Sequence, residues 1–379
     1  MMIAAILKET TLGENRVAAT PKTVKELIKS GLTVRIQSEA GKASFYSDQD
    51  YIDAGAEVIS DISSLYNNVN IVLKVAPATI AEIESFPNGT AYVSLMQTTR
   101  QSQQVQKLTE KNITGFSMHL IPRTSLAQSM DALSSQANIA GYKSVLMGAT
   151  HLPVYMPLLM TAAGTIPPAK VLILGAGVAG LQAIATAKRL GAQVEAFDVR
   201  PEVKEQVESL GAKFVEVASD SDDGVGEGGY AKETSDDYKQ RQQALIKAHI
   251  AKSNLVITTA LIPGRPAPLL IPTDMVNGMK PGSVIMDLAA ENGGNCELTQ
   301  GDEIVNHNGV IIDGTINLPS TMPAHASQLY AKNVSTFVTY MMKEGELNLD
   351  LEDEIISGAM FTHEGKITHE PTRESMGNS

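Results

Sequence analysis

A glycine-rich turn between an apolar run and a helical stretch is the feature that most constrains the fold of this chain. Residues 175–180 read Gly-Ala-Gly-Val-Ala-Gly, directly after the apolar run 170–174 and directly before a helix-like stretch over 181–190. A second apolar run, residues 194–197, leads into Asp198. Strand, glycine turn, helix, strand and acid follow one another in the order and spacing of a dinucleotide-binding unit. The sequence therefore predicts a parallel α/β domain that binds a dinucleotide.

Each residue of this motif has a physical role. Gly175 permits a tight turn, Gly177 lets the backbone approach a pyrophosphate, and Gly180 lets the helix pack against the strand. The helix N-terminus offers free N–H groups and the positive end of its dipole to the phosphates. Asp198 can accept hydrogen bonds from both ribose hydroxyls and would repel a 2′-phosphate, which favours NAD over NADP. Arg200 is the opposing signal, because an arginine there can pair with a 2′-phosphate.

Composition narrows the class of protein. A length of 379 residues is enough for two domains, each with its own core. The net charge of −12 argues against a nucleic-acid partner. The single cysteine, Cys296, excludes an intrachain disulfide and a cysteine-based zinc site, and the histidines show no metal-ligand spacing, so no metal is expected. Residues 144–168 lack Asp, Glu, Lys and Arg, but their four prolines predict a buried inter-domain helix and connector rather than a membrane span, so the chain is expected to be soluble by itself.

The N-terminal third of the chain alternates strand-like and helix-like segments. The expected strands cover residues 3–7, 33–37, 71–75, 91–95 and 114–117, and the expected helices cover 21–30 and 48–54. A long helix over 134–155 then leads into a second domain. Its expected repeating units are 171–190, 194–210, 214–217, 255–259, 284–287 and 310–313. Alternation of this kind predicts parallel sheets with helices on both faces.

The predicted fold class is thus α/β, with two Rossmann-like doubly wound parallel-sheet domains joined by long helices. The first domain would comprise residues 1–133 and 319–379, and the NAD(H)-binding domain residues 134–318. A helix over 324–343 is expected to return to the first domain, and the acidic tail 344–379 to act as a docking or linking segment. The polar stretch 218–234 is either a mobile functional loop or filler, and its composition leaves both open.

Four further stretches carry a resemblance to a known family. They are Lys8-Glu-Thr10 with residues 14–21, Leu73-Lys74-Val-Ala-Pro77, Thr259-Ala-Leu-Ile-Pro-Gly264-Arg-Pro-Ala-Pro268 and Lys280-Pro-Gly-Ser-Val284. With the glycine turn they resemble two related groups, alanine dehydrogenase and the NAD(H)-binding first domain, or alpha subunit component, of proton-translocating nicotinamide nucleotide transhydrogenase. The resemblance covers the chain to about Lys343.

The chain departs from alanine dehydrogenase where that enzyme manages a proton. In that group a histidine follows the strand that corresponds to Tyr92-Val-Ser-Leu95, and here Met96 and Gln97 stand there. Glu291 lies where the group has an aspartate. Arg16 and Lys74 do match its substrate-contacting residues, but without a general acid–base we expect them to be structural ion-pair partners. This departure disfavours an amino-acid dehydrogenase.

The transhydrogenase resemblance gives a role to residues 123–134. By chemistry alone, Gln128, Asp131 and Ser134 fall on one helical face and Arg123 could pair with Asp131, which favours a solvated helix start. The resemblance implies instead the loop that holds the nicotinamide and meets the NADP(H)-binding partner. It implies catalytic roles for Arg123, Gln128, Asp131 and Ser134, and nucleotide contacts from Arg123, Thr124, Ser125 and Gln128.

The same resemblance implies the remaining nucleotide contacts. They are Gly175, Gly177, Val178, Ala179, Gly180, Asp198, Val199, Arg200, Gly229, Tyr230, Gln242 and Leu261. Tyr230 would close a mobile loop over bound NAD(H), which favours a functional interpretation of the polar stretch.

The activity implied is that of the NAD(H)-binding component of a proton-translocating transhydrogenase. NADH bound here would pass its hydride to NADP⁺ on a partner subunit, coupled to proton movement through a membrane-spanning subunit. The resemblance further implies a homodimer on the cytoplasmic side of the inner membrane. Direct transfer between two nicotinamide rings needs orientation and exclusion of water but no proton shuttle, in agreement with the missing histidine. The alternatives are an alanine-dehydrogenase-type enzyme and a non-catalytic NAD(H)-sensing module.

Overall fold

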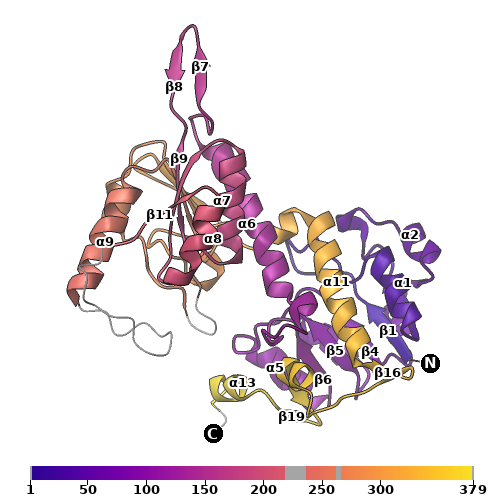
Figure 1. Cartoon of the computed structure of the whole chain (residues 1–379). Coiled ribbons are helices and arrows are strands. Elements are labelled where there is room, and N and C mark those ends of the chain that lie inside the picture. Colours follow the sequence, from indigo (N-terminus) through magenta and orange to yellow (C-terminus); the bar gives the residue numbers. More distant parts are fainter. Residues whose placement is uncertain (1, 218–235, 262–265, 378–379) are drawn as a thin grey trace. The chain divides into compact units, whose positions relative to one another are not determined.

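The computed structural model describes residues 2–217, 236–261 and 266–377, which form two compact units (Figure 1). The first unit comprises Met1–Gln136 and Pro319–Ser379, and the second Ala137–Leu318. Helix α6 (Ala132–His151) begins in the first unit and continues in the second.

The first unit is built on an eight-stranded sheet with the order β19-β18-β6-β5-β4-β1-β2-β3. Its parallel strands are β1 (Met2–Ile6), β2 (Leu32–Gln37), β3 (Glu57–Ile59), β4 (Ile71–Leu73), β5 (Ala91–Ser94) and β6 (Thr114–Ser117). The strand order reverses between β1 and β4, which makes their carboxyl ends the switch point where such sheets bind ligands.

Alternate residues of these strands enter two separate cores, one on each face of the sheet. Ala4 and Ile6 join the core formed with α1 (Pro21–Lys29) and α11 (Pro323–Met341), whereas Ala5 joins the core formed with α5 (Ser102–Glu110). Helix α1 begins where expected because Thr20 caps it and Pro21 occupies its first turn. The remaining helices of this unit are α2 (Asp48–Asp53), α3 (Ile62–Leu65), α4 (Ile80–Ser85), α12 (Glu354–Ala359) and α13 (Glu370–Ser375).

The expectation for the acidic tail is partly wrong. Strand β18 (Met360–His363) pairs with β6 in the antiparallel direction, and β19 (Lys366–Ile367) continues the sheet. The short strands β16 (Met342–Lys343) and β17 (Glu346–Leu347) precede them as a hairpin. Phe361 is fully buried against the sheet. The tail is therefore an integral piece of the first unit, although its acidic flanks hid a four-residue strand.

The second unit contains a seven-stranded sheet with the order β11-β10-β9-β12-β13-β15-β14. The parallel strands are β9 (Lys170–Leu174), β10 (Gln193–Phe197), β11 (Lys213–Phe214), β12 (Leu255–Thr258), β13 (Val284–Asp287) and β15 (Val310–Asp313), and β14 (Ile304–His307) is antiparallel. The helices besides α6 are α7 (Val178–Arg189), α8 (Lys204–Ser209), α9 (Asp236–Ile250) and α10 (Thr273–Asn277). The switch point here lies between β9 and β12. The α/β prediction, with two mainly parallel doubly wound sheets, is confirmed.

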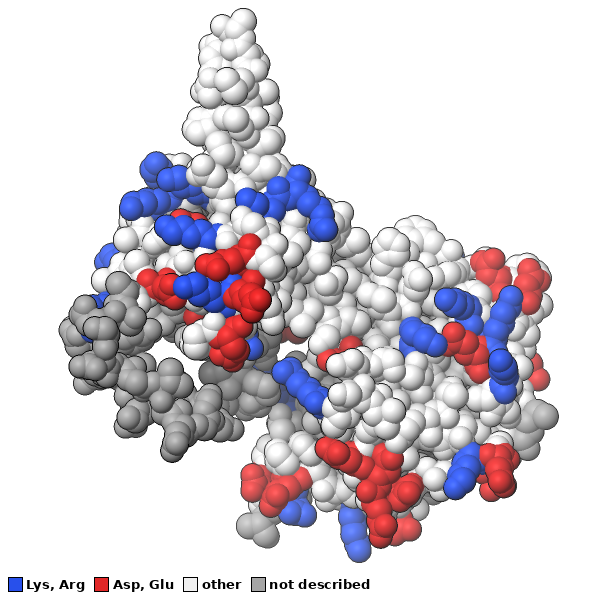
Figure 2. Space-filling view, in the orientation of Figure 1, with Lys and Arg blue, Asp and Glu red and all other residues white. Residues whose placement is uncertain are grey.

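The uncharged stretch 144–168 differs from the expected buried helix and connector. Helix α6 ends at His151, and β7 (Leu159–Thr161) and β8 (Gly164–Ile166) form an antiparallel hairpin that projects from the second unit (Figure 1). The hairpin is free of charged side chains (Figure 2), and Met160 in it is 71% exposed. Apolar composition alone did not distinguish a core segment from an exposed apolar one. In the described residues of the chain, no helix has both the length and the apolar character that crossing a membrane requires.

Candidate nucleotide-binding site

The glycine turn lies at the carboxyl end of β9, on the switch point of the second sheet. Gly175 has φ of +104°, a backbone conformation that glycine adopts without strain. A Cβ atom on Gly180 would lie 1.9 Å from the carbonyl oxygen of Gly175, so only glycine lets α7 start this close to the strand. A Cβ on Gly177 would meet nothing within 4 Å of the described chain. Gly175 and Gly180 have the turn and packing roles that the sequence predicts, and Gly177 faces open space.

The N-terminus of α7 is free to bind an anion. Gly177 is its N-cap and, within the described residues, no side chain hydrogen-bonds to this helix end. The N–H groups of a first helical turn have no intrahelical acceptor. The open space at Gly177 and these N–H groups together fit a phosphate or pyrophosphate.

Asp198 lies beside the turn, as the motif requires. Its Oδ2 accepts a hydrogen bond of 2.7 Å from the backbone N–H of Ala176. Nε and Nη2 of Arg200 each donate to this carboxylate at 3.0 Å, one to each oxygen. Partial burial raises the pKa of the Asp198 carboxyl, but these hydrogen bonds lower it by more, so its net pKa is below the usual value. A ribose that hydrogen-bonds to Asp198 must therefore share the carboxylate with Arg200 or displace it.

The other predicted contacts of the second unit follow the carboxyl ends of neighbouring strands. Val178 starts α7 after β9, Val199 follows β10 and Leu261 follows β12; all three are exposed although apolar. Ala179 is half-buried in the first turn of α7, and Gln242 is half-buried on α9. Gly229 and Tyr230 lie outside the described residues. The edge near the glycine turn thus offers apolar surface as well as N–H groups.

Thr259 is a neighbour of the turn that sequence reasoning missed. Its hydroxyl donates to the carbonyl oxygen of Gly175 at 3.0 Å and so ties the end of β12 to the turn. The available signal was weak, since it was only a polar residue that directly follows an apolar run.

The segment 123–134 belongs to the first unit and is not one helical face. Gln128 lies in a 3-10 turn (Gln128–Met130), and Asp131 precedes α6, whose first residue is Ala132. Asp131 accepts hydrogen bonds from the backbone N–H of Ser134 at 2.9 Å and from its hydroxyl at 2.6 Å. Asp131 thus caps α6, and in the described structure its partner is Ser134 rather than Arg123. The prediction of a shared helical face is wrong because three-residue spacing also fits a turn followed by a cap.

The remaining side chains of this segment are accessible. Arg123, Ser125 and Gln128 are exposed, and Thr124 is half-buried. The structure thus brings Asp131 and Ser134 together and leaves the donors of Arg123 and Gln128 at the surface of the first unit.

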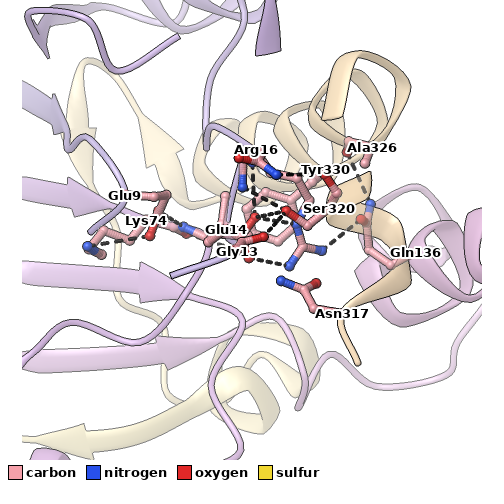
Figure 3. Close-up of polar contacts among 12 residues, drawn as sticks. Glu9, Gly13, Glu14, Arg16, Lys74, Gln136, Asn317, Ser320, Ala326 and Tyr330 are labelled. Carbon is pink, nitrogen blue, oxygen red and sulfur yellow. Dashed lines mark hydrogen bonds and ion pairs between the residues drawn. The ribbon is translucent and has the colours of Figure 1, made fainter. Parts of the chain in front are cut away.

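Arg16 is at the centre of a buried polar cluster in the first unit (Figure 3). Its Nε and Nη2 donate to the two carboxylate oxygens of Glu14 at 2.8 and 2.6 Å. Its Nη1 donates to Oε1 of Gln136 at 2.9 Å. Only 6% of the Arg16 side chain is exposed. A substrate carboxylate would have to displace Glu14 to reach the guanidinium.

Lys74 forms a second buried group beside it (Figure 3). Its ammonium lies 2.8 Å from Glu82 and 3.5 Å from Glu9, and only 1% of its side chain is exposed. Burial raises the pKa of Glu9 to about 7, and the smaller opposing effect of Lys74 does not cancel it. The prediction that Arg16 and Lys74 are ion-pair partners is confirmed. The position after β5 carries Met96, whose buried thioether cannot transfer a proton.

Comparison with known proteins agrees with this geometry. Models of the alanine dehydrogenase/PNT N-terminal and C-terminal domains match residues 5–140 and 144–370. The first of the separate polypeptides that make up the NAD(P) transhydrogenase alpha subunit of Rhodospirillum rubrum is 45% identical over 376 residues, which cover 97% of this chain and 98% of that protein. Alanine dehydrogenase of Staphylococcus haemolyticus is 28% identical over 386 residues, covering 99% and 96%.

Solved structures give the same order. A transhydrogenase from Sinorhizobium meliloti has a TM-score of 0.87 at 44% identity and covers 96% of this chain and 99% of that one. An L-alanine dehydrogenase has a TM-score of 0.85 at 26% identity and covers 100% and 99%. The chain therefore belongs to the alanine dehydrogenase/PNT family and, among these relatives, is more similar to the transhydrogenase alpha subunits than to the alanine dehydrogenases.

Proposed function

We propose that this chain is the NAD(H)-binding component of a proton-translocating transhydrogenase. Bound NADH would supply a hydride to NADP⁺ on a partner subunit. The observation that carries the proposal is the open glycine turn with Asp198 beside it, in a chain 45% identical over nearly its whole length to a polypeptide of an NAD(P) transhydrogenase alpha subunit.

The residues at the switch point of the second unit fit NAD(H). The space at Gly177 and the first turn of α7 suit the pyrophosphate, and Asp198 suits the ribose hydroxyls. The exposed apolar side chains of Val199 and Leu261 suit the flat faces of the nucleotide. Because Arg200 is already paired with Asp198, its guanidinium is less available to a 2′-phosphate, which favours NAD(H) over NADP(H).

The segment 123–134 is proposed to orient the nicotinamide for transfer. Arg123 and Gln128 are exposed donors that can contact the ring's carboxamide. Asp131 and Ser134 hold the start of α6 through their mutual hydrogen bonds and so fix the end of the loop. Contact positions of this kind control transfer by orientation, which can supply a large share of a rate enhancement without any acid–base group.

The proposed reaction has no proton for the protein to manage, and the first unit offers no place for a keto-acid substrate at Arg16. Glu14 fills the fork of the Arg16 guanidinium, and Met96 follows β5. An amino-acid dehydrogenase needs an anion site and a general acid–base there. These two features support the transhydrogenase reaction over the amino-acid dehydrogenase.

The partners follow from the same proposal. NADP(H) would be held by one partner subunit, and protons would cross through a membrane-spanning subunit at whose cytoplasmic side this chain attaches. A second copy of this chain is a further proposed partner. The hairpin β7–β8 supports the homodimer, because it exposes uncharged and apolar side chains such as Leu158 and Met160 that an interface would bury.

The test mixes the chain with an NADP(H)-binding partner and follows hydride exchange between NADH and an oxidised NADP analogue. We expect exchange with the partner and none without it. Gln128→Asn should slow exchange at least about tenfold with little loss of NADH affinity, because it shortens an orienting group. Gln103→Asn, on the exposed face of α5, is the matched control.

Two outcomes would contradict the proposal. Turnover of pyruvate, ammonia and NADH without a partner would identify an amino-acid dehydrogenase. NADH binding with no exchange in the presence of any NADP(H)-binding partner would identify a sensing module.

A further inference from the structure

The buried carboxylate of Asp287 organises the chain that follows β13. Asp287 is the last residue of that strand and is almost fully buried. Its Oδ1 accepts hydrogen bonds from the Thr258 hydroxyl at 2.9 Å and the Ala289 N–H at 3.0 Å. Its Oδ2 accepts from the N–H groups of Asn295 and Cys296 and from the Thr299 hydroxyl, at 2.8, 3.0 and 2.6 Å. Five donors satisfy this carboxylate and fix the position of Asn295.

The side chain of Asn295 holds two points of another segment. Its Nδ2 donates to the carbonyl oxygens of Ala260 at 2.9 Å and Pro268 at 2.8 Å. Its Oδ1 accepts from the N–H of Ala260 at 3.1 Å. Its carbonyl oxygen also accepts from the N–H groups of Leu270 and Ile271. A single fully buried amide therefore fixes both peptide groups of Ala260 and the backbone at Pro268.

Ala260 connects this network to the glycine turn. The preceding residue, Thr259, donates its hydroxyl to the carbonyl oxygen of Gly175. The following residue, Leu261, is 51% exposed at the same carboxyl edge of the sheet. Ala260 is thus held between the glycine turn on one side and Asn295 on the other.

We propose that Asn295, supported by Asp287, is a positioning residue of the nucleotide site that fixes Ala260 and Leu261 beside the glycine turn in the arrangement bound NADH requires. The inference rests on the proposed NADH binding at this turn. Asn295 acts through the backbone of Ala260, and its own amide is already used by protein groups.

The second unit supplies a matched control at the opposite edge of its sheet. Asn254 precedes β12 and accepts one hydrogen bond of 2.9 Å from the N–H of Lys170, at the amino end of β9. It resembles Asn295 in residue type and in bonding backbone across neighbouring strands, but it lies far along the strands from the glycine turn. Loss of Asn254 therefore tests damage to the sheet without damage to the nucleotide edge.

The experiment compares Asn295→Ala with Asn254→Ala in the full chain. NADH affinity is read from nucleotide fluorescence, which the protein's lack of tryptophan leaves free of indole emission, and thermal stability is measured in parallel. Asn295→Ala should raise the Kd for NADH roughly tenfold or more, since it removes three hydrogen bonds from the loop, whereas Asn254→Ala should change it less than about twofold. Hydrogen exchange in peptides covering 256–261 should be faster in Asn295→Ala without nucleotide.

Equal NADH affinity in the wild type and a folded Asn295→Ala variant would overturn the inference, and so would equal losses in the two asparagine variants. If Asn295→Ala does not fold, Thr299→Val carries the test, because it removes one donor to Asp287. It should raise the Kd by about threefold, and an unchanged Kd would overturn the inference. Failure of the proposed function is a separate result, seen as absent hydride exchange by a wild-type chain that binds NADH.

Discussion

Replacing Arg16 by methionine separates a structural role of the Arg16–Glu14 pair from a substrate-binding one. Methionine fills much of the same volume without charge, and it removes the forked contact at 2.8 and 2.6 Å. The variant leaves the carboxylate of Glu14, with 2% of its side chain exposed, without that guanidinium. Removing one partner of a buried ion pair costs about 3–5 kcal/mol.

The local hydrogen bonds narrow this range. Glu14 also accepts from the backbone N–H of residue 16 at 3.0 Å and from the hydroxyl of Ser320 at 3.3 Å, and both donors remain in the variant. We therefore expect the lower end of the range, about 3–4 kcal/mol. For a unit of roughly 200 residues, each kcal/mol lowers the melting temperature by about 2–4 °C, so the expected drop is roughly 6–16 °C.

Calorimetry of Arg16→Met, Glu14→Gln and the double variant measures the effect. The double variant should recover most of the lost stability, because removing both charges of a buried pair is close to neutral. The NADH Kd of the folded single variant should remain within about twofold of the wild type, since Arg16 is occupied by Glu14 and Gln136. An unchanged melting temperature together with a large loss of NADH binding or of hydride exchange would refute the structural assignment.

Three further variants test the titration and the glycine turn. Burial raises the pKa of Glu9 from 4.5 to about 7, so the stability linked to its proton is full below pH 4.5 and is lost as the pH rises through 7. Glu9→Gln should therefore gain up to about 3 kcal/mol relative to the wild type between pH 4.5 and 8 in denaturant titrations, and a constant difference would contradict this. Gly177→Ala should melt like the wild type yet bind NADH about tenfold more weakly, because its Cβ has room in the protein but not beside a pyrophosphate. Gly180→Ala should lose both properties, since its Cβ would lie 1.9 Å from the Gly175 carbonyl oxygen; wild-type melting would show that the helix can shift.

The central strands of both sheets were predictable because they are buried on both faces. Strands β6, β13 and β15 have the expected bounds, and each is an almost uniformly buried run. The sequence did not predict β3 and β14, which lie at sheet edges and carry exposed residues in place of an apolar pattern. Edge strands receive their conformation from a neighbouring strand, and local composition does not record that pairing.

The candidate site divides along the same physical line. The glycine turn was predictable because its geometry follows from residues 174–180 and the acid that ends the next strand. The support from Asp287 and Asn295 was not, because Asn295 bonds to residues 27 and 35 positions away in the sequence. In the segment 123–134, helical spacing was visible but the cap at Asp131 that interrupts it was not. Local geometry is encoded locally, whereas the shell that holds it in place depends on the completed fold.

The two switch points of the chain differ in a way that bears on where the second substrate is bound. In the second unit, the edge between β9 and β12 is open, with free space at Gly177 and the exposed side chain of Leu261. In the first unit, the edge between β1 and β4 holds Glu9 and Lys74, which are buried and paired with each other. A ligand there would have to break an ion pair in a low-dielectric site, whereas a ligand at the glycine turn replaces only water. One open switch point per chain provides for one nucleotide, so a hydride acceptor of similar size must be bound by another polypeptide.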